Sequence, residues 1–320
     1  MPQARRQRDA IYRHQRGSAA AAAVLGEAAR FVHYTTADSA LRIFESKRIW
    51  MRNATCMADY REVQHGFDIL QRFFSDKAKT AAFVDALDLC VSGAAMEAIK
   101  LFDQWWENIR LNTYITSVSE HDDTEDLHGR LSMWRAFGGN AARVALVVKI
   151  PAFSGGAAAL NLIFSPVAYL TELEAHAVIE EVVKNIRENC DFLRSVERQA
   201  SVSTVFVMLL AGVTCLKHEG FKEELEWRAI YTPKFRPSPL MESSLEVMGG
   251  VPQLVYKLPI DATVAPVLGE LDLASIFDRL IIGPSPYPWV MYEAFVDALT
   301  KAGVKGAERL VVASGIPIRS

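Results

Sequence analysis

The stretch 221–231, which reads FKEELEWRAIY, constrains the fold more than any other part of the chain. Read as a strand over Leu225–Tyr231, it places successive side chains on opposite faces of a sheet. One face is apolar and comprises Leu225, Trp227, Ala229 and Tyr231. The other face carries Glu224, Glu226 and Arg228. The apolar face predicts burial against a core, and the charged face needs an explanation of its own.

Two interpretations of the charged face follow from its chemistry. Carboxylates at positions i and i+2 repel, so one of them has a raised proton affinity unless Arg228 or a substrate cation offsets the charge. Such a pair can act as a general base or stabilise an oxocarbenium-like cation. The alternative is a solvated edge strand with an ion pair between neighbours. This stretch alone is compatible with both.

Composition sets the limits. Half of the 320 residues are hydrophobic and 23% are charged, which predicts a large core. The net charge of -3 argues against a general nucleic-acid coat but permits a local basic groove. The four cysteines form no CxxC pair and no signal peptide precedes them, so reduced thiols in a cytoplasmic protein are expected. The histidines are not at ligand spacing, so no metal is expected.

The run Val202–Leu216 is apolar but short for a membrane span, which predicts a buried helix and no membrane partner. Helices are also expected over 18–30, 81–110, 131–137, 172–198 and 288–302. Strands are expected over 31–34, 49–51, 112–119, 143–150, 163–169, 253–258, 280–282 and 310–313. Motifs typical of Rossmann dehydrogenases, P-loop NTPases, α/β-hydrolases and HExxH metalloproteases do not occur.

Three further segments carry candidate site residues. His33 lies near the end of the predicted strand 31–34 and is followed by Tyr34 and Thr35; a lone histidine there is either a core residue or ligand-facing. Asp59 and Glu62 open a helix, as a site or simply as caps. The segment 1–16 is basic, either as a frayed terminus or as an arm that touches phosphates.

The order of these motifs resembles a bacterial family, domain of unknown function 2971, over Phe31 to Arg319. The matching motifs are His33-Tyr34-Thr35, Asp59 with Glu62, Ser117-Val118-Ser119, Met133-Trp134, Glu224-Leu225-Glu226-Trp227-Arg228, Gly283-Pro284 and Ser314-Gly315-Ile316-Pro317-Ile318-Arg319. One departure is Ala58, which stands where the family commonly has Asn.

More distantly, the arrangement resembles ADP-ribosyltransferase folds. That resemblance implies an α+β fold with a split, mostly antiparallel central sheet flanked by helices. We expect one domain over 31–320 with helical insertions at about 61–110 and 171–216, and a basic arm and helix over 1–30.

The same resemblance implies roles for individual residues, with NAD as the expected co-substrate. His33 would hold the ribose, Ser117 or Ser119 would brace the pocket, and Glu226 would face the ribosyl carbon. Glu224 would orient the acceptor. Further substrate contacts are expected from Tyr34, Thr35, Trp134 and Arg228.

The expected function is therefore cleavage of an N-glycosidic bond, as an ADP-ribosyltransferase in anti-phage defence or as a toxin. One alternative is a DNA glycosylase acting on phage DNA. With nucleic acid as its substrate, it would use a groove containing Arg130, Arg135 and Arg143, beside Trp134 and Phe137. A second alternative is a non-catalytic interaction module, in which Glu224, Glu226 and Arg228 form a structural charge row.

Overall fold

The computed structural model describes residues 29–57, 62–136, 141–151 and 155–317. Its centre is a ten-stranded, mostly antiparallel sheet. Eight strands follow the order β12 (Val311–Ala313), β11 (Phe277–Ile282), β4 (Arg143–Ile150), β1 (Ala29–Thr36), β3 (Tyr114–Glu120), β2 (Arg48–Asn53), β10 (Val251–Pro259) and β9 (Glu242–Met248). Off this path, β8 (Glu226–Tyr231) pairs with β3 and with β5 (Ile163–Pro166). Only β11 and β12 are parallel within this sheet.

The sheet divides along one edge of β3. β1 pairs there only with 119–120 and β2 only with 114–115, whereas β8 pairs with the opposite edge over 114–119. Residues 116–118 therefore have no strand partner on the edge where β1 and β2 separate. A split, mostly antiparallel sheet was predicted, and the strand pairing has this form.

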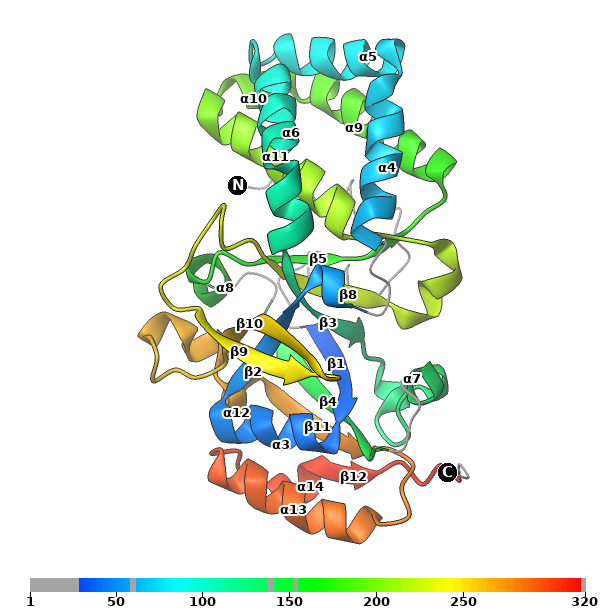
Figure 1. The fold of residues 1–320 in the computed structure, drawn as a ribbon, viewed down its shortest axis with the longest axis vertical. Coiled ribbons are helices and arrows are strands. Elements are labelled where there is room, and N and C mark those ends of the chain that lie inside the picture. The colour runs from blue at the N-terminus through cyan, green and yellow to red at the C-terminus, as the bar shows by residue number, and fades with distance from the viewer. Residues whose placement is uncertain (1–28, 58–61, 137–140, 152–154, 318–320) are drawn as a thin grey trace.

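Helices cover both faces of the sheet (Figure 1). On one face lie α3 (Ala37–Ser46), α8 (Gly155–Ala159), α12 (Leu273–Ile276), α13 (Pro288–Lys301) and α14 (Ala307–Leu310). The largest core includes Phe44 of α3, Phe295 of α13 and Leu146 of β4. On the other face, α7 (Leu131–Ala136) packs Met133 and Trp134 against β1, β4 and β11.

The two predicted insertions form one helical layer at the far end of the molecule from α13 (Figure 1). It contains α4 (Glu62–Ser75), α5 (Lys77–Asp88), α6 (Ala94–Asn112), α9 (Glu172–Glu188), α10 (Cys190–Arg194) and α11 (Arg198–Thr214). These helices share a core centred on the apolar α11, as its sequence predicted. None of the helices in the described ranges is long and apolar enough to cross a membrane.

Several predicted boundaries are wrong for identifiable reasons. The expected helix 81–110 breaks before α6, where Gly93 adopts a positive φ of 70°. The helix 172–198 divides at Asn189, and the strand 163–169 divides into β5 and a short strand β6 (Ala168–Tyr169). β6 pairs with β7 (Leu216–Lys217) in a separate sheet. Ala29 and Arg30 lie in β1 rather than in a helix; residues 1–28 of the predicted arm and helix lie outside the described residues.

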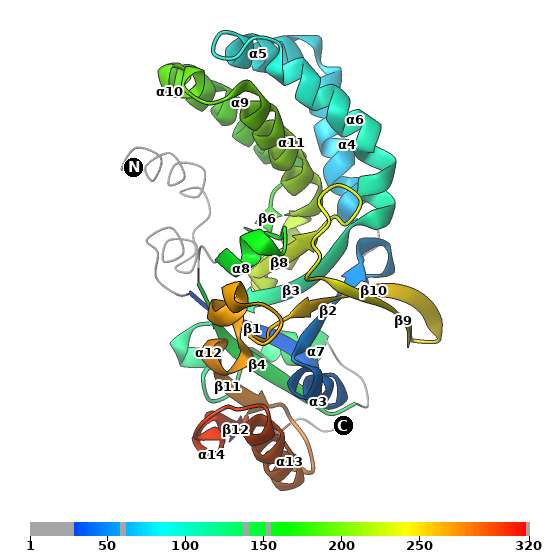
Figure 2. The ribbon, with the colours of Figure 1, turned by 90° about the vertical axis from the view of Figure 1, so that its left-hand side faces the viewer.

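Two further features were not predicted. β9 forms a hairpin with β10 that extends away from the body (Figure 2), and its Leu245 and Val247 are exposed. A disulfide joins Cys90 to Cys190 in the helical layer, so the expectation of reduced thiols is wrong for this pair. Cys56 and Cys215 are free thiols, as expected.

Candidate functional site

A cleft of about 750 Å³ opens at the split in the sheet. Its walls come from β1, β2, β3, β8, α3, α7 and the 3₁₀ helix Glu219–Glu224 (η3). Six cationic side chains line it, namely Arg42, Arg48, Arg52, Arg143, Lys217 and Arg228. The only carboxylates among its described lining residues are Glu224 and Glu226. This excess of positive charge favours an anionic ligand.

Glu226 lies in the cleft wall at the start of β8, with 6% of its surface exposed. Its Oε1 accepts hydrogen bonds from Ser117 Oγ at 2.5 Å and Arg228 Nε at 2.8 Å. Its Oε2 accepts from Arg228 Nη2 at 3.0 Å and Lys217 Nζ at 3.2 Å. Burial opposes ionisation, but the charges of Arg228 and Lys217 and the hydrogen bonds outweigh it and lower the Glu226 pKa.

Arg228 is almost fully buried, which excludes the solvated edge strand considered above. Besides its bidentate pairing with Glu226, it donates from Nη1 to the Thr214 carbonyl at the end of α11, at 2.6 Å. Lys217 bridges the two carboxylates, with its Nζ 2.8 Å from Glu224 Oε2. The charged face predicted for this strand is thus a buried network.

The observed strand β8 begins at Glu226, one residue later than predicted. Leu225 adopts a left-handed conformation, with φ of 45°, and is 41% exposed, so it does not join the apolar face with Trp227 and Tyr231. Glu224 accordingly ends η3, and its side chain is 30% exposed. The turn at Leu225 therefore separates the two carboxylates into a more exposed and a buried group.

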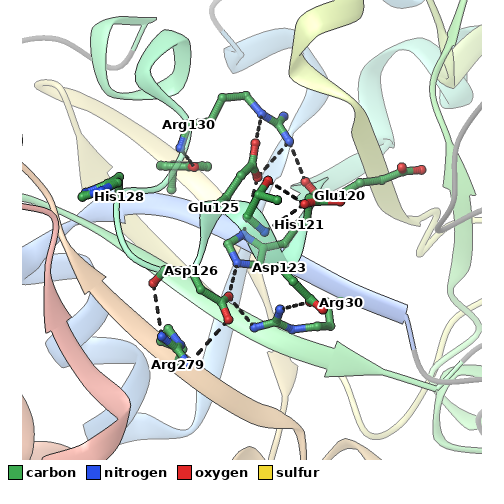
Figure 3. A network of polar contacts seen from close by, with 12 residues as sticks. Arg30, Glu120, His121, Asp123, Glu125, Asp126, His128, Arg130 and Arg279 are labelled. Carbon is green, nitrogen blue, oxygen red and sulfur yellow. Dashed lines mark hydrogen bonds and ion pairs between the residues drawn. The ribbon is translucent and has the colours of Figure 1, made fainter.

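Arg130, which Figure 3 shows beside Glu120 and Glu125, also contacts this turn. Its guanidinium donates to the carbonyls of Glu223 at 3.0 Å, Glu224 at 3.2 Å and Glu120 at 2.8 Å. It also pairs with Glu125 at 2.8 and 3.1 Å. Because two of these acceptors immediately precede Leu225 and the others lie at and after the end of β3, Arg130 links the segment after β3 to the turn before β8.

The segment after β3 is anchored in turn by a cluster of charges (Figure 3). Asp126 accepts from Arg30 at 2.7 Å and lies 2.9 Å from His121 Nε2. Arg279 Nη2 is 3.5 Å from the same carboxylate. This cluster ties the segment to β1 and β11.

His33 is connected to Glu226 through Ser117. Its Nδ1 lies 2.9 Å from the Ser117 carbonyl on the unpaired edge of β3, while Ser117 Oγ donates to Glu226. A carbonyl only accepts, so this contact requires a proton on Nδ1. Burial lowers the His33 pKa and favours the neutral ring, which leaves Nε2 as an acceptor. His33 also borders an apolar cavity of about 130 Å³ beneath the cleft.

Four other predicted substrate contacts lie at different depths. Thr35 and Ser119 line the cleft. Tyr34 lines it too, but its hydroxyl accepts from the Arg130 backbone N–H at 2.7 Å, and burial raises its pKa to about 12. Trp134 is absent from the described cleft walls: it is buried against Tyr34 and donates to the His128 carbonyl. Trp134 is thus a core residue in this structure.

The three arginines predicted to contact nucleic acid do not form one groove. Arg143 lines the cleft, whereas Arg130 is committed to the turn described above. Arg135 is exposed on α7 and is not among the described lining residues. Asp59 lies outside the described residues, as does the side chain of Glu62.

Sequence reasoning missed Lys217 and the β2 residues Trp50 and Arg52, which also line the cleft. Lys217 follows an apolar helix directly, where a lysine is exceptional and marks a buried charge partner. Trp50 lies between arginines at alternate positions of a strand, a pattern that predicts one shared face. Among the described residues, no group of three or more His, Cys, Asp or Glu side chains is arranged to hold a metal ion.

Comparison with known proteins bears on the segment that contains α7, β4, β5 and most of β8. No curated protein and no solved structure matches the chain. Residues 133–229 match the model of a family described as protein of unknown function (DUF2971). This segment includes Glu224, Glu226 and Arg228, and its match supports the expected resemblance to the DUF2971 family.

Proposed function

We propose that this protein cleaves an N-glycosidic bond at the split in the sheet and transfers the ADP-ribosyl group of NAD. The observation that supports this most directly is Glu226, a buried and ionised carboxylate held by Ser117 in the wall of a nucleotide-sized cleft. Breaking a bond between a sugar and a ring nitrogen passes through an oxocarbenium-like state, which a nearby negative charge stabilises. The distant resemblance to ADP-ribosyltransferase folds gives His33, Ser117 and Glu226 the corresponding positions on three strands.

The two carboxylates suit different steps. Each oxygen of Glu226 already accepts two hydrogen bonds, so this group acts as a fixed negative charge rather than as a base. For it to face a ribosyl carbon, the substrate has to displace Lys217 from Oε2. Glu224 is more exposed and is the expected base for the acceptor.

The bond between the ribose C1′ and the nicotinamide nitrogen breaks, and its electron pair leaves with nicotinamide as a neutral ring. An acceptor oxygen or nitrogen then forms a bond to C1′ and gives its proton to Glu224. His33 would accept a hydrogen bond from a ribose hydroxyl at Nε2, and the cationic lining would hold the diphosphate.

Release of nicotinamide from NAD by the purified full-length chain tests this proposal. Glu224→Gln is the sharper variant, since it removes a base without leaving a buried charge unpaired; we expect at least a hundredfold loss. Glu308→Gln, on the exposed α14, is the matched control. If a folded wild-type protein releases no nicotinamide with protein or nucleic-acid acceptors present, the proposal fails.

Glu226→Gln tests the electrostatic contribution. Because Glu226 neutralises buried cations, the thermal unfolding of the Glu226→Gln variant has to be measured together with its turnover. Turnover that falls with a melting temperature close to that of the wild type supports direct stabilisation of the transition state. Full turnover in both Glu224→Gln and Glu226→Gln would favour the non-catalytic module, in which the same network is structural.

A DNA glycosylase remains the second candidate, because the excess of cationic side chains in the cleft suits a phosphate backbone equally well. It differs from the transferase in needing no NAD. Abasic sites formed in phage DNA without NAD would support it, and their absence together with nicotinamide release would exclude it.

A further inference from the structure

One face of β2 carries an alternation of cationic and aromatic side chains to which the proposed chemistry gives no individual roles. Arg48, Trp50 and Arg52 occupy alternate positions and all line the cleft, whereas Met51 between them is fully buried on the opposite face. Alternate residues of a strand are about 6.6 Å apart, so the row extends over about 13 Å. We call Arg48, Trp50, Arg52 and the adjacent Lys257 the β2 strip.

Trp50 is at the centre of the β2 strip. Lys257, directly opposite on β10, places its Nζ over the Trp50 ring, 5.8 Å from the ring centroid. Trp50 is partly exposed and faces the cleft. A partly exposed indole beside a cation is a surface on which a planar base can stack.

Among the cationic residues of the β2 strip, Arg52 is the one whose charge is not neutralised by a carboxylate of the described residues. It donates to the Cys56 carbonyl at 2.8 Å and to Gln253 Oε1 at 3.4 Å, both neutral acceptors. No carboxylate pairs with it among the described residues. By contrast, Arg48 contacts Asp261 at 3.4 Å and Lys257 contacts Glu246 at 3.2 Å. Arg52 is therefore the residue of the β2 strip best suited to a phosphate.

The strip lies across β3 from Glu226, since β2 and β8 pair with opposite edges of that strand. A ligand on it would consequently approach the carboxylates from the side opposite β8. Its length and its repeated cations suit a ligand with more than one phosphate along its backbone, and its single aromatic ring suits an unpaired base.

We propose that the β2 strip binds single-stranded nucleic acid, with a base stacked on Trp50 and a phosphate at Arg52. A duplex is disfavoured because its bases are already stacked on one another. If the strip holds the acceptor of the transferase reaction, the acceptor is nucleic acid, and this role rests on the proposed function. As a binding site it does not depend on that function.

Fluorescence anisotropy with labelled 12-nucleotide DNA and RNA strands, without NAD, tests the proposal on the full-length protein. We expect a single strand to bind at least tenfold more tightly than a duplex of the same sequence. Trp50→Ala should weaken binding about tenfold or more, and Trp50→Phe should retain most of it. Trp289→Ala is the matched control, since Trp289 is 75% exposed on α13.

The salt dependence separates the two contacts. Arg52→Gln should reduce the slope of log K against log salt by about 0.7, the value for one phosphate of a single strand. Trp50→Ala should leave this slope unchanged, and Arg309→Gln on α14 should change neither quantity. Comparison of the DNA and RNA strands decides which of the two sources of this ligand the strip prefers.

Three results would overturn the proposal: no strand binding, equal binding of single strand and duplex, or equal effects of Trp50→Ala and Trp289→Ala. It would also fall if Trp50→Ala weakened NAD binding as much as strand binding, because the strip would then belong to the nucleotide site. None of these outcomes depends on nicotinamide release, so this inference and the proposed function can fail separately.

Discussion

Removing the Arg228 guanidinium should destabilise the protein strongly, because the buried Glu226 carboxylate loses its bidentate partner. Arg228 and Glu226 are 1% and 6% exposed, and three of the Arg228 hydrogen bonds have lengths of 2.6 to 3.0 Å. Breaking a buried ion pair from one side costs about 3–5 kcal/mol. Since Lys217 still contacts Glu226 at 3.2 Å, we expect Arg228→Met to lie at the lower end, about 3 kcal/mol.

Urea unfolding followed by circular dichroism and by tryptophan fluorescence measures this change, provided that the two transitions coincide. With a slope of about 3 kcal/mol per molar urea, the midpoint should fall by about 1 M. Adding Glu226→Gln to Arg228→Met should restore at least half of the loss, because it removes the unpaired charge.

The pH dependence gives an independent check. In the wild type the lowered pKa of Glu226 contributes stability that is present above its ordinary pKa of 4.5 and is lost as pH falls through the lowered value. Without Arg228, burial no longer meets the same opposition, and the carboxyl takes up a proton at higher pH. The difference in free energy of unfolding between Arg228→Met and the wild type should therefore become smaller as the pH is lowered from 7.5 to 5. A loss below about 1 kcal/mol, or no rescue by Glu226→Gln, would refute a desolvated pair.

Three further predictions concern other parts of the molecule. Arg130→Lys should lose the forked contacts to the turn and lower the free energy of unfolding in urea by about 1–3 kcal/mol. It should also reduce nicotinamide release by more than this loss of stability explains. Gly66→Ala should cost about 1–3 kcal/mol, because its Cβ would lie 2.7 Å from a backbone oxygen of α11; Gly269→Ala, which meets nothing within 4 Å, should be near neutral. Burial of its ring lowers the pKa of the partly exposed His33, so the unfolded state binds this proton first as pH falls below 6.5; stability should decrease there, and His33→Gln should flatten that part of the profile.

The fold was predictable where periodicity was strong and where both partners of a contact were visible. The apolar run that forms α11 and the alternation of β8 identified their elements, and the latter identified the charged face around Glu226. The breaks at Gly93 and Asn189 were not predicted, because helical periodicity continues across both. β9 was missed because its exposed strand alternates Glu, Ser and Leu without an obvious buried face.

The site was predictable only in part, for a related reason. Glu226 was identified through a local pattern and Ser117 through the resemblance to ADP-ribosyltransferase folds, and their contact at 2.5 Å joins strands more than a hundred residues apart. Lys217 was missed because its partners become visible only when β7 lies beside the start of β8. Trp134 was wrongly predicted to contact a ligand, because the sequence does not distinguish a core indole from a ligand-binding one. The hydrogen bond from its indole to the His128 carbonyl identifies it as a core residue.

Ser117 explains why the split in the sheet and the candidate chemistry coincide. Where β1 and β2 separate, residues 116–118 lack a strand partner on one edge, and the Ser117 carbonyl would lack a hydrogen bond. Burying such a group unpaired costs about 1–3 kcal/mol, and His33 Nδ1 supplies the missing donor. The Ser117 hydroxyl meanwhile donates a hydrogen bond to Glu226. A histidine within a strand, which sequence reasoning left open as core or ligand-facing, therefore has a structural role at the split, where its Nδ1 pairs with the Ser117 carbonyl.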